Sequence, residues 1–315
     1  MIKDYHIDNN FKSQWEKKIF SWYLLNKRDL PWRKKKNQNF YRIWISEVML
    51  QQTQVLVVIP FYKKFIKKWP NLDMFYNAKL DEILAIWQGM GYYKRAHNLF
   101  KAKELLKDKE IEIDSISLKK LPGVGDYISS AISAILKDEP CAVVDGNIRR
   151  ILMRVFDLKY DNPGLNSHIK KISQKLTPKY RNGDYCQSLM DLSNLVCKLR
   201  NPKCNVCPIS NFCLSKGKSF NNFKTKKIKK KKSVSFVVRS GKYFLLEKTS
   251  GGLLQNLFSF PLSDLEEVQE GLSFEEYLKK NVCSWMEKNE LKSSFRFIGE
   301  VNHKFSHFHL KVFIV

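Results

Sequence analysis

Four of the chain's seven cysteines lie close together in the sequence. Six residues separate Cys197 from Cys204, two separate Cys204 from Cys207, and five separate Cys207 from Cys213. A structural zinc site more often has two separated Cys-x-x-Cys pairs. A [4Fe–4S] cluster can be held by one compact and asymmetric loop of four thiolates. The spacing therefore favours one [4Fe–4S] cluster per chain over a zinc ion, and we expect its role to be structural.

Two carboxylic acids occupy positions where burial would change their chemistry. Glu47 lies in the largely apolar run 43–50, and desolvation there would raise its pKa toward neutrality. From periodicity alone, an exposed glutamate on an amphipathic helix is an equal alternative. Asp145 follows the apolar run 142–144, where it could be an ordinary helix N-cap. The residues alone leave both alternatives open.

The segment 117–127 joins two helical patterns through the glycine-rich turn Leu121-Pro122-Gly123-Val124-Gly125. Gly123 and Gly125 permit backbone conformations that other residues resist, and they leave main-chain N–H groups free at the start of a helix. Such groups bind phosphate without reading base sequence. A purely structural connection is the alternative. In a basic, helical chain we favour a DNA-binding helix-hairpin-helix, with Leu121, Gly123 and Gly125 among its contacts.

The composition indicates a folded, basic protein. The 315 residues include 56 Lys plus Arg against 31 Asp plus Glu, a net charge of +25. A surplus of this size is typical of proteins that bind a polyanion such as nucleic acid, although an AT-rich genome would explain part of it. No run approaches the roughly 18 apolar residues of a membrane span, and charged residues interrupt the N-terminal region. We expect no membrane association and a cytoplasmic, bacterial-type protein that works at the nucleoid.

The chain divides into two predicted domains, since a domain usually has about 100–200 residues. Residues 1–216 show helical periodicity, residues 217–233 form a predicted lysine-rich linker, and residues 234–315 have α+β character. In the second domain we expect a hairpin near 234–247, a helix capped by Ser273, and strands at 295–298 and 308–315.

The hairpin, the cysteine spacing and the aspartate after Val143-Val144 together resemble the endonuclease III superfamily of base-excision DNA glycosylases. Within it, four segments resemble the adenine DNA glycosylase (MutY) family. They are 30–33 (LPWR), 46–55 (SEVMLQQTQV), 89–93 (GMGYY) and 305–310 (FSHFHL). The resemblance runs from about residue 11 to the C-terminus. It implies a mainly α, helix-hairpin-helix glycosylase fold with a cluster loop and a small, Nudix-like α+β domain.

The resemblance also implies a reaction and assigns residues to it. The family removes adenine mispaired with 8-oxoguanine or guanine and leaves an abasic site. Cleaving that bond needs a proton on the base and negative charge near the sugar. Glu47 is then the acid that protonates adenine N7 and later helps to activate water, Asp145 stabilises the cationic sugar, and Asn147 orients one of the two carboxylates.

Tyr127 stands where bifunctional members of the superfamily have a lysine nucleophile. A phenol cannot form the Schiff base that leads to strand cleavage. The sequence therefore predicts a monofunctional glycosylase, with Tyr127 packed near Glu47.

Adenine must leave the base stack to reach these groups. Gln51, Gln52 and Thr53 resemble the segment that enters the duplex, and Tyr92 resembles the aromatic wedge at 8-oxoguanine. Weaker candidates, assigned by position, line the adenine pocket: Trp32, Arg33 and Gln187.

The second domain resembles a Nudix fold but has no pyrophosphohydrolase box, so we expect no nucleotide hydrolysis. Ser306 and His307 lie in the segment that approaches 8-oxoguanine in the family. The chain stops at Val315, and Gly251–Leu254 replaces a more usual Gly-Leu-Trp. We expect a shortened domain with reduced affinity for the lesion.

Two other functions remain alternatives. One is a thymine mismatch or oxidised-pyrimidine glycosylase of the same superfamily. The other is a non-catalytic iron–sulfur DNA-binding protein. The favoured partner is double-stranded DNA with an adenine:8-oxoguanine or adenine:guanine mispair, bound by a monomer.

Overall fold

The structure is a computed structural model that describes residues 7–108, 110–159, 163–218, 228–249, 257–268, 273–305 and 308–315. The chain forms two compact units that divide between Phe223 and Lys224. Each unit is described by itself.

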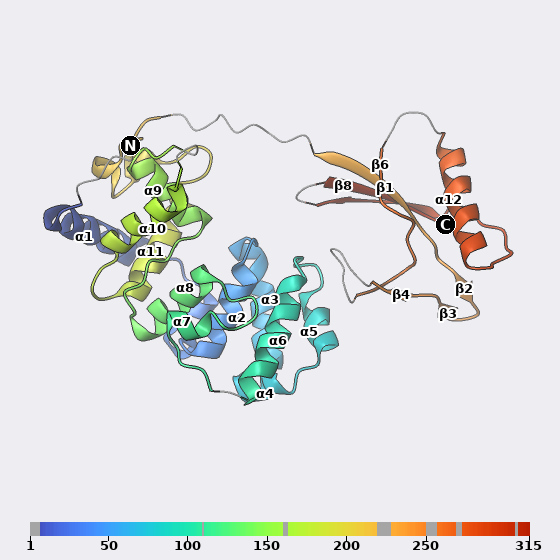
Figure 1. Cartoon of the computed structure of the whole chain (residues 1–315), viewed down its shortest axis with the longest axis horizontal. Coiled ribbons are helices and arrows are strands. Elements are labelled where there is room, and N and C mark those ends of the chain that lie inside the picture. Colours follow the sequence, from blue (N-terminus) through green and yellow to red (C-terminus); the bar gives the residue numbers. More distant parts are fainter. Residues whose placement is uncertain are drawn as a thin grey trace. The chain divides into compact units, whose positions relative to one another are not determined.

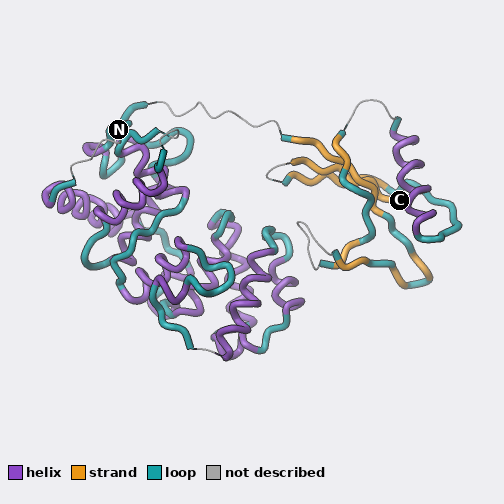
Figure 2. Tube along the Cα trace, viewed as in Figure 1, coloured by secondary structure: helices purple, strands orange, loops and turns teal. Residues whose placement is uncertain are grey.

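The first unit is helical, as the periodicity predicts (Figures 1 and 2). Its α-helices are α1 (Asn9–Asn26), α2 (Phe40–Leu50), α3 (Val55–Lys68), α4 (Leu72–Tyr76), α5 (Leu80–Trp87), α6 (Lys94–Asp108), α7 (Ser115–Leu118), α8 (Asp126–Lys137), α9 (Gly146–Val155), α10 (Leu165–Leu176) and α11 (Asn182–Leu195). Short 3₁₀ turns are η1 (Pro31–Arg33), η2 (Lys35–Asn37), η3 (Cys204–Val206) and η4 (Ser210–Phe212).

The helix α11 is the centre of the first unit, because it packs against α1, α8 and α9. Their apolar faces form one core together with α10. This core includes Trp15, Ala131, Ala134, Ile151 and Leu192. The helix α2 packs against α3 on one side and α8 on the other. The packing therefore brings α2, α8, the start of α9 and α11 together, and these elements carry the candidate acids.

The second unit contains a four-stranded sheet in the order β6-β1-β8-β7, with β1 parallel to β8 and antiparallel to β6. The strands are β1 (Lys229–Ser235), β6 (Glu266–Glu267), β7 (Gly299–Lys304) and β8 (Phe308–Ile314). Two short pairs join β2 (Arg239–Ser240) to β3 (Tyr243–Phe244), and β4 (Glu247–Lys248) to β5 (Phe258–Ser259). The helix α12 (Phe274–Lys288) packs against β1 and closes a small core with Val234, Phe236 and Phe313.

Local signals in the second unit are confirmed where they depend on neighbours in sequence. Ser273 caps α12 through a reciprocal pair of contacts with Glu276, and the predicted turn at Gly241 joins β2 to β3. The predicted hairpin itself is shorter than expected, because Val234 and Ser235 belong to β1 and pair with β8. Two predictions are wrong. The end of the predicted linker 217–233 belongs to β1, because residues 229–233 pair with β8. Residues 295–298 form no strand, and β7 begins at Gly299 instead.

Across the part of the chain that the structure describes, no helix is long and apolar enough to cross a membrane.

Candidate active site

Glu47 is buried in α2, with 8% of its surface exposed. The alternative of an exposed glutamate on an amphipathic helix is therefore wrong. Burial raises the pKa of its carboxyl from 4.5 to about 7, although the Arg33 charge and a hydrogen bond with Tyr127 act in the opposite direction. Such a carboxyl can hold a proton near neutral pH, as a general acid must.

Asp145 serves as the N-cap of α9 while keeping a second oxygen for other contacts. Its Oδ1 accepts from the backbone N–H groups of Asn147 (2.9 Å) and Ile148 (2.7 Å). Its Oδ2 accepts from the Asn147 side-chain amide at 2.8 Å. Burial raises the pKa of Asp145, and these hydrogen bonds oppose that shift. Capping and a second role can therefore coexist, and Asn147 orients this carboxylate.

Tyr127, near the start of α8, contacts Glu47 and lines a pocket with Asp145. Its hydroxyl hydrogen-bonds with the Glu47 carboxyl, and burial raises its pKa well above 10. Tyr127 and Asp145 also line one surface pocket, whose other walls include Asp126, Val144, Arg149 and Lys170. The negative charge of Asp145 raises the pKa of Glu47, so the two acids are electrostatic neighbours. Asp145 lines this pocket, and Glu47 is linked to it through Tyr127.

Of the three weaker candidates for the adenine pocket, Trp32 and Arg33 lie in η1 and Gln187 lies in α11. Trp32 is 4% exposed and packs edge-on against Tyr62. Arg33 lies near enough to Glu47 to affect its pKa, and it forms an ion pair with Asp191. The Gln187 amide donates to the Gly183 carbonyl in its own helix at 3.2 Å.

The glycine-rich hairpin connects α7 to α8 as expected, but its two glycines differ. Gly123 has a φ of +80°, and a Cβ there would lie 2.7 Å from the Asn98 Cβ. Gly125 has a φ of −89° and open space around its Cβ position, so the expectation that it adopts a backbone conformation other residues resist is wrong. Leu121 is 5% exposed, because its side chain packs into the core. The predicted role of Leu121 among the DNA contacts of the hairpin would therefore fall to its backbone, and it stays a prediction.

The two segments with predicted roles in the duplex, 51–53 and Tyr92, are held by one buried residue, Arg95. Its guanidinium donates to the carbonyls of Met49 and Gln51, each at 2.6 Å, and to that of Gly91 at 3.0 Å. Gln52 has a φ of +55°, and Tyr92 a φ of +53° with 45% of its surface exposed. Sequence reasoning missed Arg95, because an arginine in a helical pattern usually lies in solvent.

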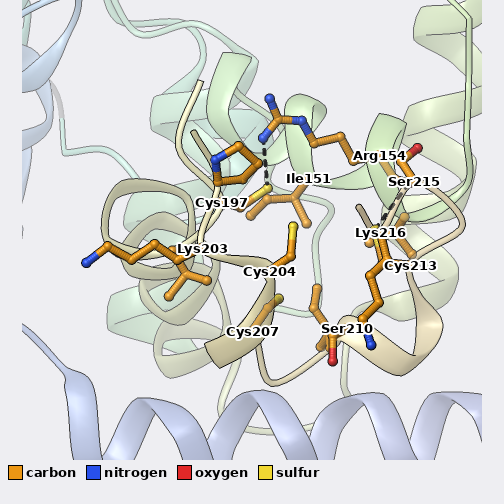
Figure 3. A pocket seen from close by; sticks show the side chains of 14 residues that line it. Ile151, Arg154, Cys197, Lys203, Cys204, Cys207, Ser210, Cys213, Ser215 and Lys216 are labelled. Carbon is orange, nitrogen blue, oxygen red and sulfur yellow. Dashed lines mark hydrogen bonds between the residues drawn. The ribbon is translucent and has the colours of Figure 1, made fainter. Parts of the chain in front are cut away.

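The four clustered cysteines line one cavity, which Figure 3 shows beside α9. Arg154 on α9 donates to the Cys197 sulfur at 3.3 Å and to the Lys198 carbonyl at 2.7 Å. None of the seven cysteines forms a disulfide. Among the described residues, no group of three or more Cys, His, Asp or Glu side chains is placed to hold a single metal ion. The observed arrangement is thus a shared cavity with four sulfur donors around it.

Ser306, His307 and the segment 251–254 lie outside the described residues, so their predicted features have no structural description here.

Comparisons with known proteins identify the family. Residues 45–182, which contain Glu47, Tyr127 and Asp145, match the HhH-GPD superfamily of base excision DNA repair proteins. The adenine DNA glycosylase of Buchnera aphidicola subsp. Schizaphis graminum (strain Sg) is 37% identical over 313 residues, which cover 93% of this chain and 84% of the relative. This chain belongs to the adenine DNA glycosylase family.

Solved structures agree with that assignment at the level of the fold. A thermostable thymine-DNA glycosylase matches with a TM-score of 0.60 and 26% identity, over 66% of this chain and 97% of the other. A trapped endonuclease III–DNA covalent intermediate matches with a TM-score of 0.54 and 22% identity, over 65% of this chain and 95% of the other. The predicted family, the mainly helical fold and the enzyme class, a DNA N-glycosylase, are therefore confirmed.

Proposed function

We propose that this adenine DNA glycosylase family member is a monofunctional enzyme that excises adenine paired with 8-oxoguanine or guanine in double-stranded DNA. The observation that carries the proposal is a buried Glu47 whose pKa is about 7, hydrogen-bonded to Tyr127 and electrostatically coupled to Asp145. The name of the Buchnera relative supports adenine as the base.

In the proposed reaction, an extruded adenosine occupies the pocket at Tyr127 and Asp145. Glu47 gives its proton to N7, and the C1′–N9 bond breaks with its electron pair moving to the base. Asp145, ionised and oriented by Asn147, stabilises the oxocarbenium ion. The Glu47 carboxylate then accepts a proton from water as water bonds to C1′. Excision should therefore decline as pH rises through about 7.

The tyrosine at position 127 supports the proposal that the enzyme does not cleave the DNA strand. Its phenol bonds to Glu47 and has no amine to attack C1′. Gln51, Gln52, Thr53 and Tyr92 are the proposed contacts beside the estranged base, on a framework held by Arg95.

The four thiols fit a [4Fe–4S] cluster, because thiolate sulfur is its preferred ligand and all four surround one cavity. Cys197, Cys204, Cys207 and Cys213 would hold it. The cluster would supply a covalent cross-link of the loop beside α9. Iron and sulfide analysis of anaerobically purified protein, with a Cys204→Ser control, tests this assignment.

An excision assay tests the function. The protein is incubated with duplexes that carry adenine opposite 8-oxoguanine, adenine opposite guanine, thymine opposite guanine, or an oxidised pyrimidine, with and without alkali. Cleavage of the adenine strand only after alkali supports the proposal. Thymine release would favour the activity named for the structural neighbour, and nicking without alkali would reveal a lyase.

Matched variants locate the acid in the same assay. Glu47→Gln should bind the mispaired duplex but lose excision by at least about a hundredfold, the usual worth of a general acid. Glu110→Gln changes an exposed glutamate in a loop and should excise like the wild type.

A further inference from the structure

Asp191 is a fully buried carboxylate that sequence reasoning did not single out. It lies in α11 with none of its surface exposed. Its oxygens accept two bonds from the Arg33 guanidinium, at 2.7 and 3.0 Å. They also accept one from Arg28 Nε at 2.6 Å and one from the Arg28 backbone N–H at 3.1 Å. A bidentate pair of this kind fixes the orientation of the guanidinium.

The charges in this cluster do not cancel. Two guanidinium groups, 20% and 13% exposed, share a single carboxylate, so the cluster retains one positive charge. The turn η1, which carries Arg33, packs against α2, which carries Glu47. The Arg33 charge lowers the pKa of Glu47. A positive charge beside a general acid favours its ionised, inactive form. The enzyme therefore needs Arg33 in place but partly neutralised.

We propose that Asp191 is a positioning residue for base excision: it fixes the Arg33 guanidinium beside Glu47 and limits the positive charge that acts on that acid. The inference rests on the proposed function, in which Glu47 donates the proton. Asp191 acts through Arg33, whose guanidinium it holds by two hydrogen bonds.

The surroundings of Glu47 determine the direction of the effect. Arg33 comes from η1, Tyr127 from α8, Asp145 from the start of α9, and the Cys186 thiol from α11. Burial is the largest influence on the pKa of Glu47 and raises it, while Arg33 is the largest opposing one. Tyr23, on α1, packs beneath the Arg33 guanidinium and adds no charge near neutral pH, because its pKa is about 12.

Removing the Asp191 charge and removing the Arg33 charge should therefore shift the pKa of Glu47 in opposite directions. Asp191→Asn keeps the shape but leaves Arg33 and Arg28 unneutralised, so the pKa of Glu47 should fall by roughly one unit. Arg33→Gln removes the nearest cation, so the pKa of Glu47 should rise by a similar amount. Because Asp191 acts through Arg33, the double variant should keep the raised pKa of Arg33→Gln, with little further change from Asp191→Asn.

The experiment measures single-turnover excision of adenine against pH for the wild type and these three variants. The alkaline limb of the Asp191→Asn profile should lie at lower pH, with about a tenfold slower rate above pH 7 and recovery toward the wild-type rate at acid pH. The Arg33→Gln limb should lie at higher pH, whatever its maximal rate. A purely structural role would lower the rate equally at all pH values, and that result would overturn the proposal.

A second readout does not depend on excision. The ¹³C carboxyl signal of Glu47, assigned with Glu47→Gln in glutamate-labelled full-length protein, reports its titration directly. Opposite shifts of its midpoint in Asp191→Asn and Arg33→Gln support the proposal even if adenine proves not to be the substrate. Unchanged midpoints, or shifts of the same sign, contradict it. If Asp191→Asn does not fold, the Arg33→Gln midpoint alone decides, and an unshifted midpoint overturns the proposal.

Discussion

Burial of the Glu47 carboxyl affects the stability of the protein as well as the proposed chemistry. Its pKa is about 7 in the folded chain but near 4.5 when exposed to water. Between these values the folded protein retains a proton that the unfolded chain releases. Rising pH therefore stabilises the unfolded state more than the folded state, and the free energy of unfolding falls between these two pH values. Burial thus gives the acid its proton at neutral pH and weakens the fold under the same conditions.

Glu47→Gln should consequently stabilise the protein at alkaline pH. The amide keeps the shape of the side chain but never carries the buried charge. Urea unfolding should show a gain of up to about 3 kcal/mol near pH 8 and almost none below about pH 5, as linkage requires. A gain that is the same at both pH values would show that the pKa of Glu47 is not raised by folding. Glu110→Gln, at an exposed position, should change neither value.

At the scale of elements, we expect the two glycines of the α7–α8 hairpin to have different roles: Gly123 in folding and Gly125 in DNA binding. Gly123 has a left-handed backbone and a close neighbour in α6, whereas Gly125 has neither. Gly125 is nevertheless the N-cap of α8 and offers no side-chain cap to the first N–H groups of the helix, and its Cβ position faces open space. That space would admit a DNA phosphate close to the backbone.

Alanine at the two glycines should therefore have different effects. Gly123→Ala should lower the free energy of unfolding by about 2 kcal/mol or more, because a left-handed alanine is strained and its Cβ contacts Asn98. Gly125→Ala should cost less than about 1 kcal/mol. It should still weaken binding to an undamaged duplex severalfold, because its Cβ occupies the space offered to phosphate. Urea unfolding and fluorescence anisotropy measure the two effects, and wild-type affinity in Gly125→Ala would exclude this contact.

Elements were predictable from the sequence where their causes are local. The Ser273–Glu276 capping box starts α12 because its partners are three residues apart. Residues 229–232 are different, since a run of lysines repels itself and favours an exposed linker. Their strand exists because β8, about 80 residues later, pairs with them, as at Lys231 opposite Leu310. A contact at that separation leaves no signal in the local pattern.

The same limit applies to the site. Glu47 and Asp145 could be named because an apolar context and a family motif surround each of them. Arg95 and Asp191 could not, since a charged residue in a helix is exposed by default. In retrospect, Asp191 follows Leu189 and Met190 and precedes Leu192, an apolar context like that of Glu47. That context indicates burial but does not reveal the arginine that compensates for it.

For the whole molecule, the net charge of +25 should act mainly on encounter with DNA and little on catalysis. Each phosphate that Lys or Arg neutralises releases counterions, so affinity should decrease with salt. Glu47 is buried, and salt screens buried charges weakly.

Salt should therefore separate binding from excision. We expect the dissociation constant for a mispaired duplex to rise at least about tenfold between about 50 mM and 200 mM salt, linearly on a logarithmic plot. The single-turnover rate with saturating enzyme should change less than about twofold over the same range, because the acid is shielded from solvent. Anisotropy and quenched-gel kinetics supply the two values. If affinity does not depend on salt, the lysine excess reflects genome composition alone. If the excision rate decreases in parallel with affinity, the charged groups that carry out catalysis are exposed to solvent.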